Sequence, residues 1–400
     1  MDVGQVMEQL NLPDGAWQND WPASEATFPK DILFLKKEFL AEACAALQMK
    51  EDILAAFMET SAMFNYNPAL RRFFWHCRHV LLDREKYGYP QFMALPTPAG
   101  DREMFYAFVF LSVLPAVRTF HQQHGIPEDI AIDSLSDLEL WVRTYHEWYG
   151  RWGFGERNWL FHHFRGNIYK LGRLQFLIDC FEDDLHLLRG RNDPSVMLLA
   201  PDATPYRRDG QFDGTSGVWE DQPKRTRYQE TNEAYTGTHI TPDGRITNDP
   251  VHLKKSDWQE VLKKGDPALS FHIPAVGPMD TEACRQSFTR AMDFFPKHFP
   301  DKPFKAFFSH SWLYDDQLRF YLPPDSNIIR FQRECYLYPL QGTNDKQLFE
   351  RVFNDRFTTI HQAPQNTSLQ KAVVAHVKNG GHWRTSGALL LPETIRDSRR

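Results

Sequence analysis

Two histidines near the ends of strand-like runs could take part in proton transfer. His272 closes the run LSFHIP, and His310 has a similar place in FFSHSWL. If Phe271 and Ile273 face the core, strand alternation puts His272 on the opposite face, toward a cleft. A neutral imidazole there could act as a general base, while a hydrogen bond to a neighbouring strand's backbone is the plainer role for each ring.

The turn after His272 could bind an anion. In the segment 268–295, a buried strand, a Gly/Pro turn and a long amphipathic helix follow one another. The start of such a helix offers free backbone N–H groups and the positive end of the helix dipole, which together favour a phosphate. We therefore expect the backbone of Ala275, Val276 and Gly277 to form the seat of the anion.

The same helix begins with acidic residues. Asp280 or Thr281 fits a plain N-cap, and a carboxylate there would compete with a phosphate for the same N–H groups. Arg285 and Gln286 lie one turn further along and could reach an anion from the side. The sequence thus leaves open whether the anion seat lies at the helix start or has moved.

Residues around His310 offer further contacts to a substrate. Its serine neighbours point to the opposite face of a strand, and no G-x-S-x-G motif occurs, so a serine hydrolase triad is not indicated. Ser311 could hydrogen bond a substrate, and Trp312 could stack on one or pack in the core. After a double proline, Ser326 and Asn327 predict a loop whose side chains cap a helix or bind a polar ligand.

Helical periodicity dominates the first half of the chain. The apolar run 105–114 is about ten residues long, about half of what a membrane span needs, so it predicts a core helix and no membrane span. From 151 to 181, many aromatic and Arg residues with four glycines predict extended pieces. Apolar residues recur at three- and four-residue spacing in four segments, 28–47, 50–64, 67–82 and 134–150.

The second half alternates strands and helices, which is the pattern of an α/β domain. A Pro-Asp-Gly turn at 242–244 predicts a hairpin. Ser256 followed by Gln259 is a capping-box pattern, so a helix is expected over 256–266. The other expected elements are strands at 268–273, 304–313 and 382–392 and a helix at 367–381.

Three motifs, HIPAVGP, SHSWLYD and PPDSNI, together resemble the GNAT-like C-terminal domain of a two-domain bacterial acyltransferase family. The first half then resembles that family's N-acyltransferase N-terminal domain. The resemblance implies a mainly helical domain at 1–190 and a GNAT-like mixed-sheet domain of the α+β or α/β class at 191–400. It also implies an acyl-CoA co-substrate and a direct transfer of the acyl group to a small-molecule amine acceptor.

The resemblance further implies a general acid. Tyr321, after the second strand, is the positional candidate for protonating the CoA thiolate, with Tyr314 as the alternative. The GNAT phosphate-binding pattern Arg/Gln-x-x-Gly-x-Gly/Ala is absent, because the corresponding turn has only Gly277. Two other functions therefore stay open: a GNAT-derived sensor that binds CoA or another anionic ligand without turnover, and a hydrolase of thioesters or amides.

Composition excludes several classes of protein. The 46 Lys and Arg residues are outnumbered by 52 Asp and Glu residues, which argues against nucleic-acid binding. The five cysteines never form a CxxC pair, and the N-terminus lacks a signal-peptide pattern, so we expect reduced thiols in a cytoplasmic protein. The paired histidines of WHCRH lack matching ligands on a second element, so no metal site is expected. Nothing in the sequence indicates an oligomeric state.

Overall fold

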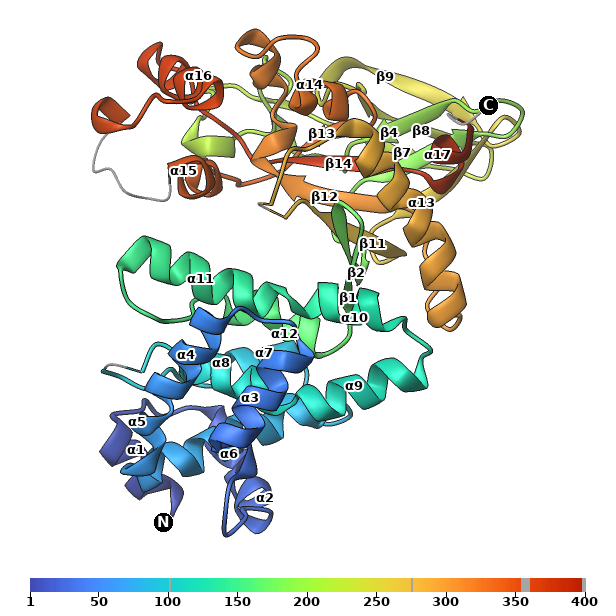
Figure 1. Cartoon of the computed structure of the whole chain (residues 1–400). Coiled ribbons are helices and arrows are strands. Elements are labelled where there is room, and N and C mark those ends of the chain that lie inside the picture. The colour runs from blue at the N-terminus through green and yellow to red at the C-terminus, as the bar shows by residue number, and fades with distance from the viewer. Residues whose placement is uncertain (101, 275, 354–359, 398–400) are drawn as a thin grey trace. The chain divides into compact units, whose positions relative to one another are not determined.

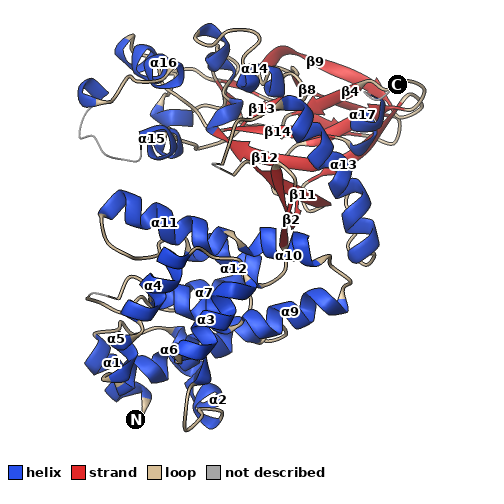
Figure 2. Cartoon of the chain, in the orientation of Figure 1, coloured by secondary structure: helices blue, strands red, loops and turns tan. Residues whose placement is uncertain are grey.

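The protein, seen here in a computed structural model that describes residues 1–100, 102–274, 276–353 and 360–397, has two compact units. They are Met1–Lys170 and Leu171–Arg400, so the chain divides earlier than the residue 190 expected from the sequence. Helices predominate in the first unit and the strands gather in the second (Figure 2). The expected fold class, a helical domain followed by a mixed-sheet domain, is confirmed.

The helices of the first unit are labelled in Figure 1. Their buried side chains form a core that is rich in aromatic residues. Phe57, Phe73 and Phe105 are fully buried, and the rings of Phe73 and Phe105 stack 5.4 Å apart. Its helices are α1 (Val3–Leu10), α2 (Trp21–Ala26), α3 (Lys37–Ala46), α4 (Glu51–Thr60), α5 (Ala62–Asn65), α6 (Pro68–Leu82), α7 (Tyr89–Met93), α8 (Phe105–Ser112), α9 (Leu114–Gln123), α10 (Glu128–Leu135), α11 (Asp137–Tyr149) and α12 (Arg157–Phe164).

Local sequence signals set several helix ends in this unit. Asn67 caps α6 by accepting a hydrogen bond from the backbone N–H of Leu70, as expected for an Asn-Pro start. The expectation of extended structure over 151–181 is wrong for α12. Gly166, with φ of +64°, lies just beyond the end of this helix, so this glycine terminates a helix and does not break one. The segment 28–47 is α-helical only from Lys37.

Most of the strands form two large sheets, and all strands of these sheets except β1 lie within the second unit. The first has the order β1-β2-β11-β12-β14-β13, and the second has the order β10-β3-β4-β8-β7 with β9 paired to β8. The first sheet is formed by β1 (Ile168–Leu171), β2 (Leu174–Cys180), β11 (Pro267–His272), β12 (Phe307–Ser311), β13 (Tyr336–Pro339) and β14 (Ser386–Leu390). The second is formed by β3 (His186–Gly190), β4 (Val196–Leu199), β7 (Tyr228–Glu230), β8 (Ala234–Ile240), β9 (Ile246–Lys254) and β10 (Trp258–Lys263).

Both faces of the first sheet are buried. On one face, Phe271 of β11 and Phe307 of β12 pack against Phe288 of α13 (Thr281–His298), with ring centroids 5.1 and 5.0 Å apart. On the other face, Phe308 belongs to an apolar core shared with the second sheet. The remaining elements of the unit are β5 (Pro205–Tyr206), β6 (Lys224–Arg225), α14 (Asn327–Gln332), α15 (Lys346–Phe353), α16 (Ser368–Lys378) and α17 (Pro392–Asp397).

One expected helix is a strand. Residues 256–266 were expected to be helical, but β10 pairs antiparallel with β3 at the edge of the second sheet. The capping box does not form, because the Ser256 hydroxyl bonds Asp257 and Gln259 pairs with Arg189 in the ladder. Cross-strand pairing has overridden a weak local signal. The expected hairpin is confirmed, with β8 and β9 joined through the turn at 242–244.

Removing the cap of α13 should destabilise the second unit. The Asp280 carboxylate accepts a hydrogen bond from the Ala283 N–H at 2.8 Å, so Asp280→Ala is expected to lower the free energy of unfolding by about 1 kcal/mol. The measurement is the midpoint of urea unfolding. Asp293→Ala, at an exposed position of the same helix, is the control and should leave the midpoint nearly unchanged. Equal midpoints for the two variants would contradict this role of Asp280.

Acid should destabilise the first unit through its buried histidines. Burial lowers the pKa of His76, His121 and His162 to about 4, below the ordinary value of 6.5. As the pH falls from 6.5 toward 4, the unfolded chain therefore binds protons that the folded unit excludes, and the free energy of unfolding decreases. His76→Gln should make the fall in urea midpoint between pH 7 and pH 5 shallower than in the wild type. An equal fall in the urea midpoint of the wild type and of His76→Gln would show that His76 does not contribute to the acid destabilisation.

Candidate functional site

The two parallel strands of the first sheet separate at their carboxyl ends. β11 and β12 are in register at Leu269↔Phe307 and Ser270↔Phe308, and within the described residues their pairing stops there. β11 continues to His272 along β2, while β12 continues to Ser311 along β14. The sheet therefore opens between the ends of β11 and β12, at the position where α/β folds place ligands.

His272 and His310 lie on either side of this opening. His272 lies two residues beyond Ser270 on β11, and His310 lies two residues beyond Phe308 on β12. Because Phe271 faces α13 and side chains alternate along a strand, both histidines lie on the sheet face opposite α13. The His272 Nε2 is 3.2 Å from the Ser270 hydroxyl.

The His310 ring is held by a carboxylate and a tyrosine. Its Nε2 is 2.7 Å from Oδ2 of Asp183, and that oxygen also accepts a hydrogen bond of 2.7 Å from the Tyr338 hydroxyl. With Asp183 as acceptor, the neutral ring carries its proton on Nε2 and keeps its lone pair on Nδ1. The His310 side chain is 34% exposed. His310 is thus oriented by a carboxylate and remains accessible as a base.

Burial keeps the tyrosine of this group protonated. Tyr338 is fully buried, and its burial together with the neighbouring Asp183 raises its pKa well above 10. Its hydroxyl therefore stays a hydrogen-bond donor at neutral pH. Sequence reasoning missed both Asp183 and Tyr338, which lie 127 and 28 residues from His310. The available signal was the acidic run Glu182–Asp184 directly after β2.

Gly387 allows Tyr338 to reach the other two residues. In the sheet, Gly387 of β14 lies between His310 of β12 and Tyr338 of β13. A Cβ atom on Gly387 would lie 2.1 Å from Cζ of the Tyr338 ring, so the ring lies across β14 only because this position has no side chain.

The surroundings of His310 are acidic. Burial raises the pKa of Asp179 on β2, with Glu182 adding to the shift and His310 opposing it. Asp183 and the exposed Glu182 and Asp184 lie on the turn that follows β2. Several carboxylates near one half-exposed imidazole favour the approach of a cation.

The turn between β11 and α13 is arranged differently from the sequence-based expectation. Ala275 lies outside the described residues. Val276 is 41% exposed, and Gly277 has φ of +71°. Asp280 is the N-cap of α13, as the sequence indicated. Its carboxylate accepts a hydrogen bond from the Ala283 N–H, which is one of the backbone groups at the helix start that were expected to bind an anion.

Arg173, which sequence reasoning missed, brings a positive charge to this turn. Its Nε and Nη2 donate hydrogen bonds to the backbone carbonyls of Pro278 and Gly277 at 2.9 and 3.2 Å. Its Nη1 is buried and has no hydrogen-bond partner among the described residues. By contrast, Arg285 forms a two-pronged ion pair with Glu334, and Gln286 donates to Glu282. Arg173 therefore has more free capacity for an anion than either predicted residue.

The other predicted residues lie apart from the histidine pair or serve the fold. Ser311 accepts a hydrogen bond from the Leu313 N–H, and Trp312 is 8% exposed within an apolar cluster. Ser326 stands at the N-cap position of α14 with its Oγ buried and unpartnered, and Asn327 is the first residue of that helix. Ser311 therefore caps the turn that follows β12 and Trp312 packs in the core, whereas the Ser326 side chain makes no capping hydrogen bond.

Tyr321 contacts a different histidine. Its hydroxyl is 3.0 Å from Nδ1 of His376 on α16, and its ring lies 5.9 Å from that of Trp383. The alternative general acid, Tyr314, is buried and donates to the Ser309 hydroxyl at 3.1 Å. The structure thus places His272 and His310 at the ends of neighbouring strands on one face of the sheet, and it groups Tyr321 with His376.

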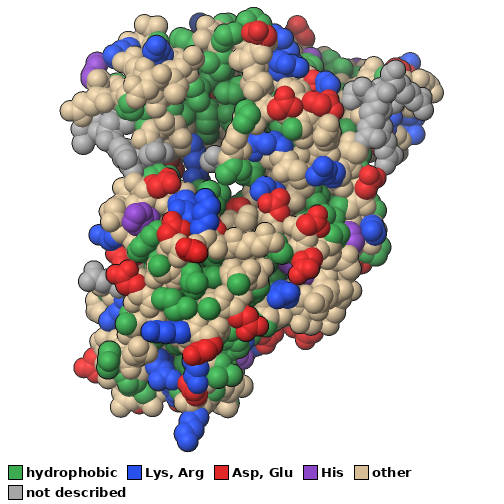
Figure 3. Space-filling model, viewed as in Figure 1, with side chains coloured by type: hydrophobic (Ala, Val, Ile, Leu, Met, Phe, Trp, Pro, Cys, Tyr) green, Lys and Arg blue, Asp and Glu red, His purple; other side chains and the backbone are tan. Residues whose placement is uncertain are grey.

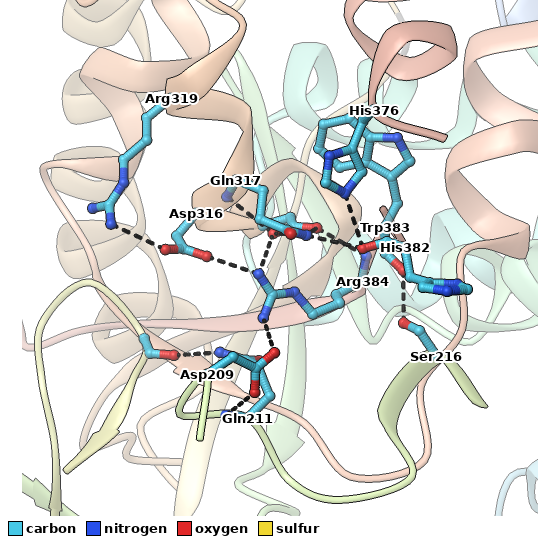
Figure 4. A network of polar contacts seen from close by, with 12 residues as sticks. Asp209, Gln211, Ser216, Asp316, Gln317, Arg319, His376, His382, Trp383 and Arg384 are labelled. Carbon is cyan, nitrogen blue, oxygen red and sulfur yellow. Dashed lines mark hydrogen bonds and ion pairs between the residues drawn. The ribbon is translucent and has the colours of Figure 1, made fainter. Parts of the chain in front are cut away.

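A network of ionic contacts surrounds Arg384 (Figure 4). Arg384 contacts Asp316 at 3.1 Å, and the Arg384 N–H donates to Asp315, which is fully buried. Burial raises the pKa of Asp315, and Arg384 opposes this shift. Arg245 and Arg319 approach Asp316 at 2.8 and 3.3 Å. Every charge in this network therefore has an opposite charge nearby, which offsets the cost of burying it.

Other kinds of site find no support in the described residues. Among them, no three His, Cys, Asp or Glu side chains are grouped so that they could hold a metal ion. None of the described helices combines the length and apolar character that crossing a bilayer requires. On the face seen in Figure 3, acidic and basic side chains are interspersed.

Comparison with known proteins adds a family and a fold. A family model described as the GNAT-like C-terminal domain matches residues 168–390, and one described as the N-acyltransferase N-terminal domain matches residues 38–166. A solved mutant acyltransferase in complex with octanoyl-CoA shares 24% identity at a TM-score of 0.69. A solved acyltransferase in complex with decanoyl-CoA and teicoplanin shares 24% sequence identity with this chain at a TM-score of 0.68. Each comparison covers 98% of this chain and 99% of the other. No curated protein matches the chain.

A side chain at Gly387 should displace Tyr338. Because a Cβ atom there overlaps the Tyr338 ring, Gly387→Ala is expected to lower the free energy of unfolding by about 1–3 kcal/mol, measured by urea unfolding. Gly155→Ala is the control, because its Cβ would meet no atom closer than 3.8 Å. Wild-type urea midpoints for both variants would show that Tyr338 does not depend on this glycine.

Proposed function

The chain belongs to the family of the GNAT-like C-terminal domain, and from this premise we propose that it is an N-acyltransferase that moves an acyl group from acyl-CoA to an amine. The observation that carries the proposal is His310, held by Asp183 beside the opening between β11 and β12. The solved acyltransferases with octanoyl-CoA and decanoyl-CoA support a medium-chain acyl donor.

In the proposed reaction, His310 acts as the general base. Its Nδ1 lone pair takes a proton from the ammonium form of the acceptor, and Asp183 stabilises the resulting imidazolium through Nε2. The free amine then attacks the thioester carbonyl and the C–S bond breaks, which leaves one extra proton on the nitrogen of the product. The departing CoA thiolate takes up that proton, so one neutral amide and one CoA thiol are formed, and the His310 imidazolium releases its proton to solvent.

Other residues have supporting roles in the proposal. Tyr338 donates to Asp183 and keeps the carboxylate in place, which makes it a positioning residue. Asp179 and the acidic turn after β2 attract the ammonium group of the acceptor. Arg173, with its unpartnered Nη1 beside the turn at Gly277, is our candidate for contacting the CoA phosphates. His272, across the opening, is the second candidate base.

A second function is favoured by one feature of the turn. Asp280 occupies the start of α13, where other GNAT proteins would present free N–H groups to a pyrophosphate. A sensor that binds CoA or another anion without turnover would tolerate this arrangement. Such a protein would bind octanoyl-CoA and release no thiol, whereas a hydrolase would release thiol without any amine.

Removing the base or its carboxylate should reduce the rate of transfer. His310→Gln and Asp183→Asn are each expected to lower kcat/KM by about 10²–10⁴-fold, because the proton acceptor is lost or no longer oriented. The measurement is amine-dependent thiol release from octanoyl-CoA with a panel of primary amines. The dissociation constant of octanoyl-CoA should stay within about threefold of the wild-type value, which separates chemistry from binding.

The matched control is His361→Gln, at an exposed position of the same unit. It should retain wild-type activity. If the wild type releases thiol only with amine but His310→Gln is as active as the control, the assignment of His310 is wrong. If the wild type binds no acyl-CoA, the proposed function itself fails.

A further inference from the structure

The second unit contains a groove beside the edge strand β10. It has a volume of about 660 Å³ and is lined by β10, the C-terminal part of α13, the loop 299–305 and the start of α17. Helices α13 and α17 contact each other and lie side by side in Figure 1. Ligand sites in proteins usually measure about 300–1,000 Å³, so this groove has the size of a binding site.

The outer edge of β10 has backbone groups available for pairing. β10 is the outermost strand of the second sheet, and among the described residues no further strand lies on its outer side. The Arg191 N–H donates to the Asp257 carbonyl at 2.8 Å, which fixes the alternation of the antiparallel ladder. The backbone of Gln259 therefore faces β3, and the backbone groups of Trp258 and Glu260 face the open edge. Such an edge is a template for another strand.

Apolar residues and prolines form most of the wall of the groove. Met292, Phe299 and Leu391 are buried parts of it, with 8%, 2% and 6% of their surface exposed. Four prolines line it as well. Because the proline ring fixes the φ angle, these parts of the wall have little backbone freedom to lose when a ligand binds.

The charges of the wall leave a positive excess. The acidic residues of the wall, Glu260 and Glu393, each have a basic partner. The Glu260 carboxylate is 3.2 Å from the Lys263 ammonium group. The Glu393 carboxylate is 3.6 Å from the Arg189 guanidinium group. Lys302 is exposed and forms no ion pair with the described residues, so the groove favours an acidic ligand.

We propose that an extended, acidic segment of a partner protein binds in this groove as an additional strand on β10. Its backbone forms hydrogen bonds with Trp258 and Glu260, and one of its carboxylates pairs with Lys302. Its apolar side chains contact the wall at Met292 and Phe299. This site lies within the second unit and does not depend on the proposed transferase function.

The test measures binding of a fluorescein-labelled peptide to the full-length protein by fluorescence anisotropy. The peptide has six residues, the length of β10, in which Asp and Val alternate. We expect saturable binding, and a peptide with Lys in place of Asp should bind at least tenfold more weakly.

Methylation of the peptide's amide nitrogens tests strand addition itself. In an extended strand, the N–H groups of the Asp residues and those of the Val residues point to opposite edges, so only one set can face β10. We expect methylation of one set to weaken binding at least tenfold and methylation of the other set to leave it nearly unchanged.

Lys302→Glu should weaken binding of the acidic peptide at least fivefold, because an attractive charge becomes a repulsive one. The matched control is Lys371→Glu, which makes the same charge change at an exposed position of α16 outside the groove wall. It should bind the peptide as the wild type does.

Four results would overturn the proposal. They are the absence of saturable binding to the wild type, equal binding of the acidic and the basic peptide, equal effects of the two methylated sets, and equal binding by Lys302→Glu and its control.

Discussion

The separation of β11 and β12 is the constraint on which the rest of the candidate site depends. Neighbouring parallel strands normally stay paired along their length. Here β11 stays paired with β2 and β12 stays paired with β14, while the pairing between β11 and β12 ends early. This opens the interior of a sheet without leaving a long unpaired edge, because β2 and β14 still hold the outer sides. Backbone groups and side chains at the two strand ends become available to a ligand while the sheet beneath stays rigid.

The group around His310 is built from elements distant in the sequence. The carboxylate comes from the turn after β2, the imidazole from β12 and the hydroxyl from β13. They meet because β14 carries Gly387 between β12 and β13, which lets an aromatic ring lie across the strand. Packing of Phe181 against both Phe308 and Tyr338 fixes the same turn from the core side. The positions of the polar groups are thus set by apolar contacts.

Features encoded by neighbouring residues could be predicted from the sequence. The N-caps at Asn67 and Asp280, the hairpin at 242–244 and the order of β11, α13 and β12 each depend on a short stretch of chain. Strand β10 and helix α12 could not be predicted from the sequence, because tertiary contacts outweigh the local signals in these segments. Asp183, Tyr338 and Arg173 were missed, since only the folded sheet brings the first two to His310 and Arg173 to the turn at Gly277. Tyr321 was selected from its position after the second strand, but its hydrogen-bond partner, His376, could not be predicted from that position.

We propose that the opening between β11 and β12 supports acyl transfer to an amine. The most direct test is the identity of the products formed from octanoyl-CoA and a primary amine, determined by mass spectrometry alongside the amount of CoA released. The expected products are the N-octanoyl amide and CoA in equal amounts, with no product when the amine is omitted. Octanoate as the product, formed at the same rate without amine, would contradict it.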